Sequence, residues 1–233
     1  MSTRQRLDRF LAHALDISRT DAQKLVRRER VTVAGELVKD PSMHVDDEVE
    51  VTLDGDPVIA FGRVVLMMHK PAGLLSATRD PSDRTVLDLV PKSLKPRDLS
   101  PIGRLDKDTT GLLLLTNDGQ LNHRLTHPKR HVPRTYRVTF EDGMEADAVA
   151  RVAAGLTLED GTELMPAVLE RLSETEARLV LHQGVYHQVK RMIAVLGGTV
   201  TALHREGFGP LVLDSLALGQ VRSLTDAEIA SLE

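Results

Sequence analysis

The sequence predicts an α+β protein with a largely antiparallel, mixed sheet flanked by helices. Segments with strand-like patterns and segments with helical period follow one another irregularly, without the strand–helix–strand alternation of a doubly wound fold. A small module of two helices and short strands precedes a larger mixed region. The chain has 233 residues, 41% of them hydrophobic, which is enough for a sizeable core in one or two domains.

Composition excludes several classes of protein. Because the chain has no Cys, it has no disulfide, no thiolate metal site and no Cys nucleophile. No apolar run reaches the roughly 18 residues of a membrane helix. The first residues, MSTRQRLDRF, lack the apolar stretch of a signal peptide, so we expect a cytoplasmic protein without a membrane partner.

The net charge of -4 argues weakly against nucleic acid, but it hides an uneven distribution. Residues 1–39 and 61–140 are basic, with nine Lys/Arg against five Asp/Glu and fourteen against seven. Residues 40–60 and 141–233 are acidic, with none against seven and seven against fifteen. Such asymmetry marks a polyanion-binding face, although solvated helix faces also produce it.

The amino-terminal elements follow from local patterns. Apolar residues at helical spacing predict an amphipathic helix over 5–15. Ser18, three residues before Asp21, resembles a capping box and starts a second helix. Alternation around an Ala-Gly turn predicts a hairpin over 31–37, and a further strand follows over 49–53 before a turn that ends the module near residue 58.

The stretch RLDRFLAHALDISRTDAQKLVRRERVTVAGELVKDPSMHVDDEVEV resembles the small RNA-binding domain named after ribosomal protein S-four, and we assign residues 1–59 to it. In that family the helix pair and the next loop present cations to folded RNA. Such cations neutralise phosphates without reading sequence, whereas the simpler alternative is a solvated basic helix face. The RNA-binding residues that the resemblance implies are Arg6, Arg9, Arg19, Lys24, Arg27, Arg28 and Arg30.

The second region starts with a continuous apolar run over 64–68, typical of a buried strand, which ends at Lys70-Pro71-Ala72-Gly73. Residues 79–101 predict a loop with short helices. Another buried strand is expected over 112–115. A short helix over 120–127 ends before Pro128.

A basic loop then leads into the rest of the domain. Strands are expected over 136–140, 166–170, 177–181 and 200–203. Helices are expected over 147–154, 189–196 and 226–232, the last capped by Thr225.

Chemistry concentrates in the segment GRLDKDTTG, where Asp106 lies in a turn bracketed by Gly103 and Gly111, just before a buried strand. Functional groups often lie at such element ends. Two other interpretations of Asp106 and Asp108 stay open at this point. They can simply build the turn, or they can begin a divalent metal site that needs further oxygen ligands.

The segment GRLDKDTTGLLLLTNDG resembles the active-site motif of the pseudouridine synthases, specifically the RsuA type that modifies ribosomal RNA. HKPAG, RTY, YHQVKRM and LHREGFGPLVL occur in that family's order, so the resemblance covers nearly the whole chain. It implies a catalytic domain over 62–233 and a reaction that needs no metal and no cofactor. His123, His127 and His131 are therefore expected to be surface or RNA-facing residues.

The resemblance also implies residue roles. Asp106 acts at the ribose of the target uridine, as nucleophile or as base, and a carboxylate suits either role. Tyr136 stacks on the target base. Lys190 pairs with Asp106, and a neighbouring cation keeps a carboxylate ionised.

Three further residues are expected to bind the substrate. Arg104 helps to hold the nucleotide, which must leave the base stack to be reached. Leu203 packs against the base. Arg191, beside Lys190, is the third.

We therefore predict isomerisation of one uridine in small-subunit (16S) ribosomal RNA by a monomer, acting on RNA or on an assembly intermediate. A pseudouridine synthase acting on 23S ribosomal RNA is the nearest alternative. The others are a non-catalytic RNA-binding assembly factor and a metal-dependent enzyme that uses Asp106 and Asp108.

Overall fold

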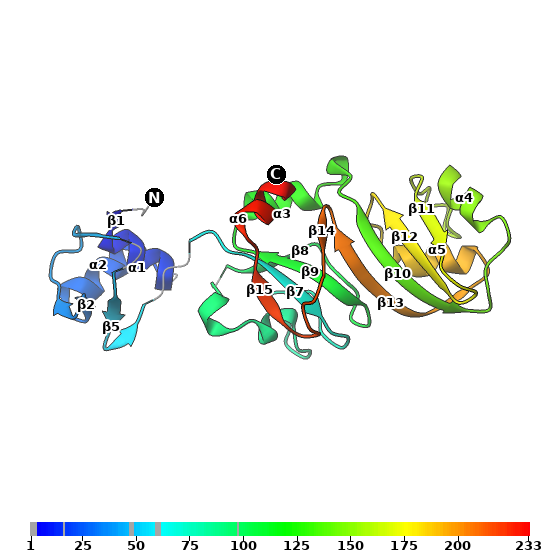
Figure 1. The fold of residues 1–233 in the computed structure, drawn as a ribbon. Coiled ribbons are helices and arrows are strands. Elements are labelled where there is room, and N and C mark those ends of the chain that lie inside the picture. Colours follow the sequence, from blue (N-terminus) through cyan, green and yellow to red (C-terminus); the bar gives the residue numbers. More distant parts are fainter. Residues whose placement is uncertain (1–3, 16, 47–48, 59–61, 97) are drawn as a thin grey trace. The chain divides into compact units, whose positions relative to one another are not determined.

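The structure is a computed structural model that describes residues 4–15, 17–46, 49–58, 62–96 and 98–233. The chain divides into two compact units, Met1–Gly62 and Arg63–Glu233. Figure 1 shows the elements of each unit along the chain.

The first unit has its own apolar core. Its helices are α1 (Leu7–Leu15) and α2 (Arg19–Arg27), and its antiparallel four-stranded sheet has the order β3 (Glu36–Leu37), β2 (Val31–Val33), β5 (Val51–Leu53), β6 (Asp56–Pro57). A separate pair joins β1 (Gln5–Arg6) to β4 (His44–Val45). Both helices turn buried residues such as Leu11 and Val26 toward this sheet, whose inward side chains include Val31.

Local signals placed most of these elements correctly. The Ser18 hydroxyl accepts a hydrogen bond from the Asp21 amide at 3.0 Å and caps α2, as predicted. The expected helix over 5–15 is two residues too long, because residues 5 and 6 pair with β4 instead. The predicted strand over 49–53 begins only at Val51, where pairing with β2 begins.

The second unit is built on one nine-stranded sheet. Its strands are β7 (Val65–Lys70), β8 (Ser100–Ile102), β9 (Thr110–Thr116), β10 (Arg134–Glu141), β11 (Val168–Arg171), β12 (Glu176–Leu181), β13 (Thr199–Phe208), β14 (Leu211–Val212) and β15 (Val221–Ser223). The main order is β11-β12-β10-β13-β9-β7-β15, with β14 on β13 and β8 on β9. Only the β9–β13 pair is parallel among these pairings of described residues. The predicted α+β fold with a largely antiparallel mixed sheet is confirmed.

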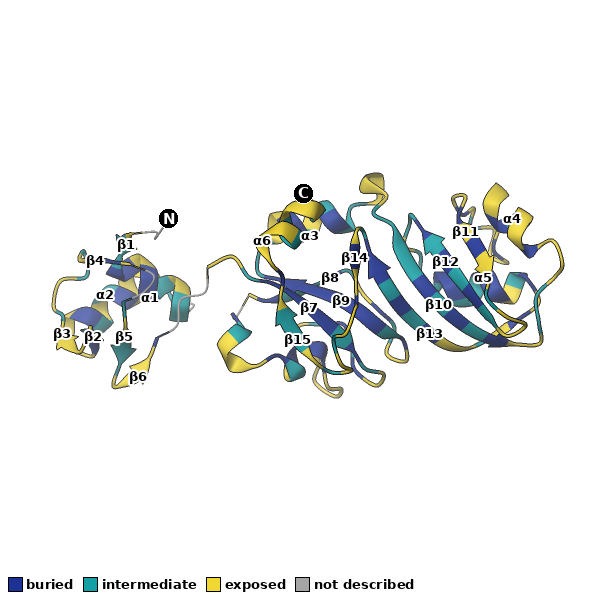
Figure 2. Ribbon diagram, viewed as in Figure 1, coloured by how far each residue is buried: buried dark blue, intermediate teal, exposed yellow. Residues whose placement is uncertain are grey.

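Both faces of the sheet are covered at β7 and β9, which explains the continuous apolar runs of these two strands. In β7, Leu66 and Met68 face one core, together with α4 (Ala148–Ala154) and α5 (Gln188–Val195). Val65 and Met67 face the other core, under α3 (Gly119–Thr126) and α6 (Asp226–Leu232). Successive strand residues point to opposite faces, so a strand buried on both sides shows no alternation. Figure 2 shows β7 and β9 as almost uniformly buried.

The largest departures from the sequence prediction are short or extended strands. The segment 79–101 contains the expected short helices, η1 (Val86–Leu89) and η2 (Lys92–Leu94), but β8, which was not predicted, begins at its end. The strands β14 and β15 were also missed, and the strand expected over 200–203 runs to Phe208. Strands of two or three residues are defined by their partners, so their own sequence carries little signal.

The remaining helices agree with the prediction. Thr225 caps α6 in a full capping box: its hydroxyl accepts from the Glu228 amide at 3.2 Å, and its own amide donates to the Glu228 carboxylate at 2.8 Å. The helix expected over 120–127 is α3, which ends at Thr126, and a third 3₁₀ segment, η3 (Pro128–Arg130), follows it. Among the described helices, none is both long and apolar enough to cross a bilayer.

Candidate active site

The loop that carries Asp106 joins β8 to β9 and closes as a tight turn, with the Thr109 amide donating to the Asp106 carbonyl at 3.1 Å. Directly after the loop, β9 pairs with β13 in parallel through Thr110 and Gly111. Gly111 has φ +112°, and a Cβ there would lie 2.3 Å from the Arg205 carbonyl oxygen. Only glycine permits this approach, so Gly111 sets how closely the Asp106 loop lies against β13.

A buried lysine, Lys70, forms hydrogen bonds with the backbone of this loop. Its ammonium donates to the carbonyl oxygens of Asp106 at 3.1 Å, Lys107 at 3.3 Å and Thr109 at 2.8 Å. Burial lowers the pKa of Lys70 to about 8, against the attraction of the Asp108 and Asp106 carboxylates. Three carbonyls of one turn therefore converge on a single cation, which fixes the backbone under the Asp106 side chain.

Two further contacts secure the same loop. The Gly73 amide donates to the Lys107 carbonyl at 2.7 Å. The Ser76 hydroxyl donates to the Leu105 carbonyl at 2.9 Å and accepts from the Leu105 amide at 3.1 Å. The HKPAG motif and the residues after it therefore support the backbone of the Asp106 loop, and we call them the floor of the site. No role for Lys70 was predicted from the sequence, although it belongs to the HKPAG motif.

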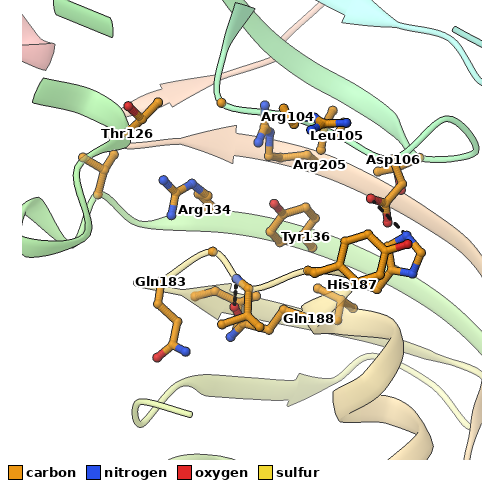
Figure 3. Close-up of a pocket in the computed structure, with 18 of the residues that line it drawn as sticks. Arg104, Leu105, Asp106, Thr126, Arg134, Tyr136, Gln183, His187, Gln188 and Arg205 are labelled. Carbon is orange, nitrogen blue, oxygen red and sulfur yellow. Dashed lines mark hydrogen bonds and ion pairs between the residues drawn. The ribbon is translucent and has the colours of Figure 1, made fainter. Parts of the chain in front are cut away.

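Asp106 opens onto a pocket of about 940 Å³, near the upper end of the roughly 300–1,000 Å³ typical of ligand sites. Arg104, Tyr136 and Leu203 line the same pocket, as Figure 3 shows for the first two. Tyr136 and Leu203 are almost fully buried in its wall, Arg104 is exposed, and the Asp106 side chain is 29% exposed. The structure thus brings together four predicted residues that come from the loop, β10 and β13.

Lys190 reaches the loop from α5 but does not line the pocket. Its ammonium lies 3.6 Å from Asp106 Oδ2 and donates to Asp108 Oδ1 and Oδ2 at 2.8 and 2.7 Å. That hydrogen bond lowers the pKa of Asp108. The predicted pairing partner of Asp106 is therefore shared between two carboxylates.

Two neighbouring side chains were not predicted. His187, the residue before α5, has a left-handed backbone with φ 51° and places Nε2 3.6 Å from Asp106 Oδ1 (Figure 3). The ring of Tyr186 stacks on it, with centroids 3.8 Å apart, and is itself 76% exposed at the pocket. Both residues belong to the motif YHQVKRM. The positive φ of His187, which is uncommon for a residue other than glycine, could not be predicted from the sequence.

Arg191 stands apart from the other predicted site residues. It forms an ion pair with Asp160 at 2.6 Å and is absent from the pocket wall. Within the part of the chain that the structure describes, no three His, Asp or Glu residues are grouped as a metal site. Instead, the Lys190 ammonium lies between Asp106 and Asp108.

In the first unit, a buried carboxylate ties down part of the predicted RNA-binding surface. Asp8 accepts from Arg6 at 2.9 Å, Arg19 at 3.0 Å and Gln23 at 2.9 Å. These hydrogen bonds, that of Arg6 foremost, hold the pKa of Asp8 well below its usual range. Arg6 and Arg19 therefore also serve the structure of the unit.

The other cations divide into two groups. Lys24 pairs with Asp21 at 2.8 Å, and Arg30 pairs with Asp54. The second group is exposed on α1, on α2 or just after α2, and it has no ion pair to any described residue. Its members are Arg9, Arg27 and Arg28. These three arginines are the freest to meet an external anion.

Together, the mixed sheet and the carboxylate-bearing pocket define an RNA pseudouridylate synthase with an added small domain. The family model for RNA pseudouridylate synthase matches residues 64–195, and that for the S4 domain matches residues 5–51. This chain belongs to the RNA pseudouridylate synthase family, so the resemblance found in the sequence is confirmed.

Relatives span the whole chain. The Ribosomal small subunit pseudouridine synthase A of Escherichia coli is 43% identical over 230 residues, 97% of this chain and 99% of that protein. The Uncharacterized RNA pseudouridine synthase YtzG of Bacillus subtilis is 41% identical over 230 residues, 96% of each chain. A solved structure described as a pseudouridylate synthase has 38% identity and a TM-score of 0.70, covering 98% of this chain and 100% of its own.

Proposed function

We propose that this protein converts one uridine of small-subunit (16S) ribosomal RNA to pseudouridine, with Asp106 as the catalytic carboxylate. The observation that carries the proposal is the position of Asp106. Its carboxylate is partly exposed at a pocket walled by Tyr136 and Leu203, with an ammonium 3.6 Å away. The choice of the small subunit rests on relatives named for it, among them those of Escherichia coli and Vibrio cholerae.

The reaction rearranges one nucleotide and needs no outside reactant. The bond from ribose C1′ to uracil N1 breaks, the uracil turns, and a bond from C1′ to C5 forms. The proton on C5 leaves, and N1 gains one. Asp106 serves either as a nucleophile that is later released from the ribose, or as a base that takes a ribose proton and returns it, and the ammonium of Lys190 lies 3.6 Å away.

The walls of the pocket suit a base that has left its stack. Tyr136 offers an aromatic ring and Leu203 an apolar contact, both held by the paired strands β10 and β13. Arg104 is exposed at the same pocket, with no ion pair to a described residue, so it is free to hold the displaced nucleotide or its strand. Arg191, outside the pocket wall, would meet RNA only at the periphery.

The two units divide the work in this proposal. Residues 1–59 dock RNA mainly through Arg9, Arg27 and Arg28, since cations on rigid helices bind phosphates without reading bases. Residues 62–233 carry out the isomerisation. We propose that the protein is a cytoplasmic monomer and acts on ribosomal RNA or on a small-subunit assembly intermediate.

The test is pseudouridine mapping of both ribosomal RNAs in a strain that lacks the gene. We expect one 16S site to disappear, to return with the wild-type gene, and to stay absent with Asp106→Asn. Loss of a 23S site instead refutes the choice of substrate. A complete set of pseudouridines in both RNAs refutes the proposal.

A further inference from the structure

The pocket continues past Tyr136, away from Asp106, into a region that the proposed chemistry does not use. In the view of Figure 3, Tyr136 lies between Asp106 and Arg134. Arg134 and Arg205 both line the pocket, and Arg134 precedes Tyr136 by two residues on β10. Arg205 lies directly opposite Tyr136 on β13.

Arg205 is a buried cation with an unsatisfied end. Its side chain is among the largest fully buried ones, and the residue is only 1% exposed. Nε donates to the Leu112 carbonyl at 2.6 Å, but Nη2 is buried without any hydrogen-bond partner in the described structure. The guanidinium carbon lies 5.5 Å from the ring centroid of Phe208. Ring and carbonyl hold the group in place without neutralising it.

Arg134 is the accessible member of the pair. Its guanidinium carbon also lies 5.5 Å from the ring centroid of Phe208, the residue that is paired with Arg134 across β10 and β13. The side chain is half-buried and makes no hydrogen bond or ion pair with any described residue. Burial lowers the pKa of Arg134, and the charge of Arg205 lowers it further. Two guanidinium groups therefore share one region, and neither is ion-paired with a carboxylate of the described residues.

The charge of the whole pocket agrees with this. Among the described residues that line it, five are Lys or Arg, and Asp106 alone is acidic. Removing a cation from water is unfavourable unless an anion or hydrogen bonds replace the water. An arginine that is held unpaired near such a pocket is suited to bind an anion from outside, and its planar fork matches phosphate oxygens.

We propose that the region between Arg134 and Arg205 is a phosphate subsite, which takes a backbone phosphodiester next to the target nucleotide. Arg134 contacts the phosphate oxygens, and Arg205 adds a fixed second charge from the floor. The subsite rests on the proposed function, which supplies the RNA. It makes the pocket hold a backbone group together with the target base, in keeping with its volume of about 940 Å³.

The test couples one side chain to one linkage. RNA oligonucleotides that contain the mapped target uridine are made with single neutral methylphosphonate linkages on its 5′ and 3′ sides. Their binding is measured to the wild type, to Arg134→Met and to Arg137→Met. Arg137 is a matched control on the same strand, because it pairs with Glu206 at 2.7 Å and lies outside the pocket.

We expect Arg134→Met to weaken binding of unmodified RNA about tenfold and to reduce the slope of log affinity against log salt by about 0.7. Arg137→Met should stay near the wild type. One methylphosphonate should weaken the wild type to a similar extent and leave Arg134→Met unchanged. Arg205→Met is a secondary variant, since its buried position can compromise folding.

Two failures are distinguishable. If the wild type restores no pseudouridine to ribosomal RNA in the strain that lacks the gene, the proposed function is wrong and the subsite falls with it. If it isomerises the RNA, but every methylphosphonate weakens Arg134→Met as much as the wild type, only the phosphate subsite is overturned.

Discussion

Lys190 donates hydrogen bonds to both carboxylate oxygens of Asp108, at 2.8 and 2.7 Å, while it stands 3.6 Å from Asp106. The Asp108 side chain is 70% exposed, so water screens most of this attraction. The ammonium therefore stays free to turn toward Asp106 at little cost. Asp108 keeps Lys190 near the site without holding it away from the carboxylate that we assign to catalysis.

This relationship gives the first prediction. Lys190→Met should lower kcat about 100-fold, because it removes the positive charge beside Asp106. Loss of one such group from an active site typically lowers kcat by about 100-fold or more. Asp108→Asn should change kcat by no more than about threefold, since an exposed ion pair contributes little. Single-turnover kinetics on the target RNA measure both. Equal losses in the two variants would show that Lys190 acts through Asp108 instead.

The second prediction concerns Asp106 itself. Asp106→Asn keeps the shape of the side chain but removes its charge and its nucleophile, so pseudouridine formation should become undetectable. The RNA dissociation constant should stay within about threefold, because phosphate contacts dominate affinity. Asp142→Asn, a loop carboxylate outside the pocket wall, is the control. Normal turnover by Asp106→Asn would contradict the assignment.

The third prediction addresses the floor of the site. Lys70→Met removes the cation on which three loop carbonyls converge, and misplacement of a reacting group by about 1 Å can cost about 100-fold in rate. We expect kcat to fall by that order while RNA affinity is retained. Lys92→Met, an exposed lysine of η2, should leave kcat unchanged. A folded Lys70→Met variant with wild-type kcat would show that the loop does not need this contact.

The fourth prediction links the first unit to pH. The pKa of Asp8 is depressed in the folded state, so its contribution to stability is present above about pH 4, the usual Asp pKa, and is lost as the pH falls further. Asp8→Asn should cost about 1–3 kcal/mol at pH 7. Near pH 3 the two proteins should differ less. Hydrogen exchange of the β2 and β5 amides measures this, and a constant difference across this range would contradict it.

The fifth prediction separates the cations of that unit. Replacing both Arg27 and Arg28 by Met should weaken RNA binding about tenfold or more and reduce its salt dependence, because both are exposed without an ion pair to a described residue. Lys24→Met should have a smaller effect, since Lys24 is already paired with Asp21. Affinities at several salt concentrations decide this, and the reverse order would place the RNA elsewhere.

Much of the fold was predictable because its signals are local. The continuous runs that became β7 and β9, the caps at Ser18 and Thr225, and the helix before Pro128 each reflect a neighbouring group of residues. The short strands β8, β14 and β15 were missed, because their identity depends on partners elsewhere in the chain.

By itself, the sequence determined the fold class, the order of motifs, and the place of Asp106 in a turn just before a buried strand. Only the tertiary structure decided what surrounds that carboxylate. The loop carbonyls that Lys70 binds are 36 to 39 residues away from it in the sequence. The bonded residues Lys190 and Asp108 are 82 residues apart, and Arg205 and Leu112 are 93 apart. Hydrophobic period and capping act within a few residues, so they predict elements but not contacts made across the sheet.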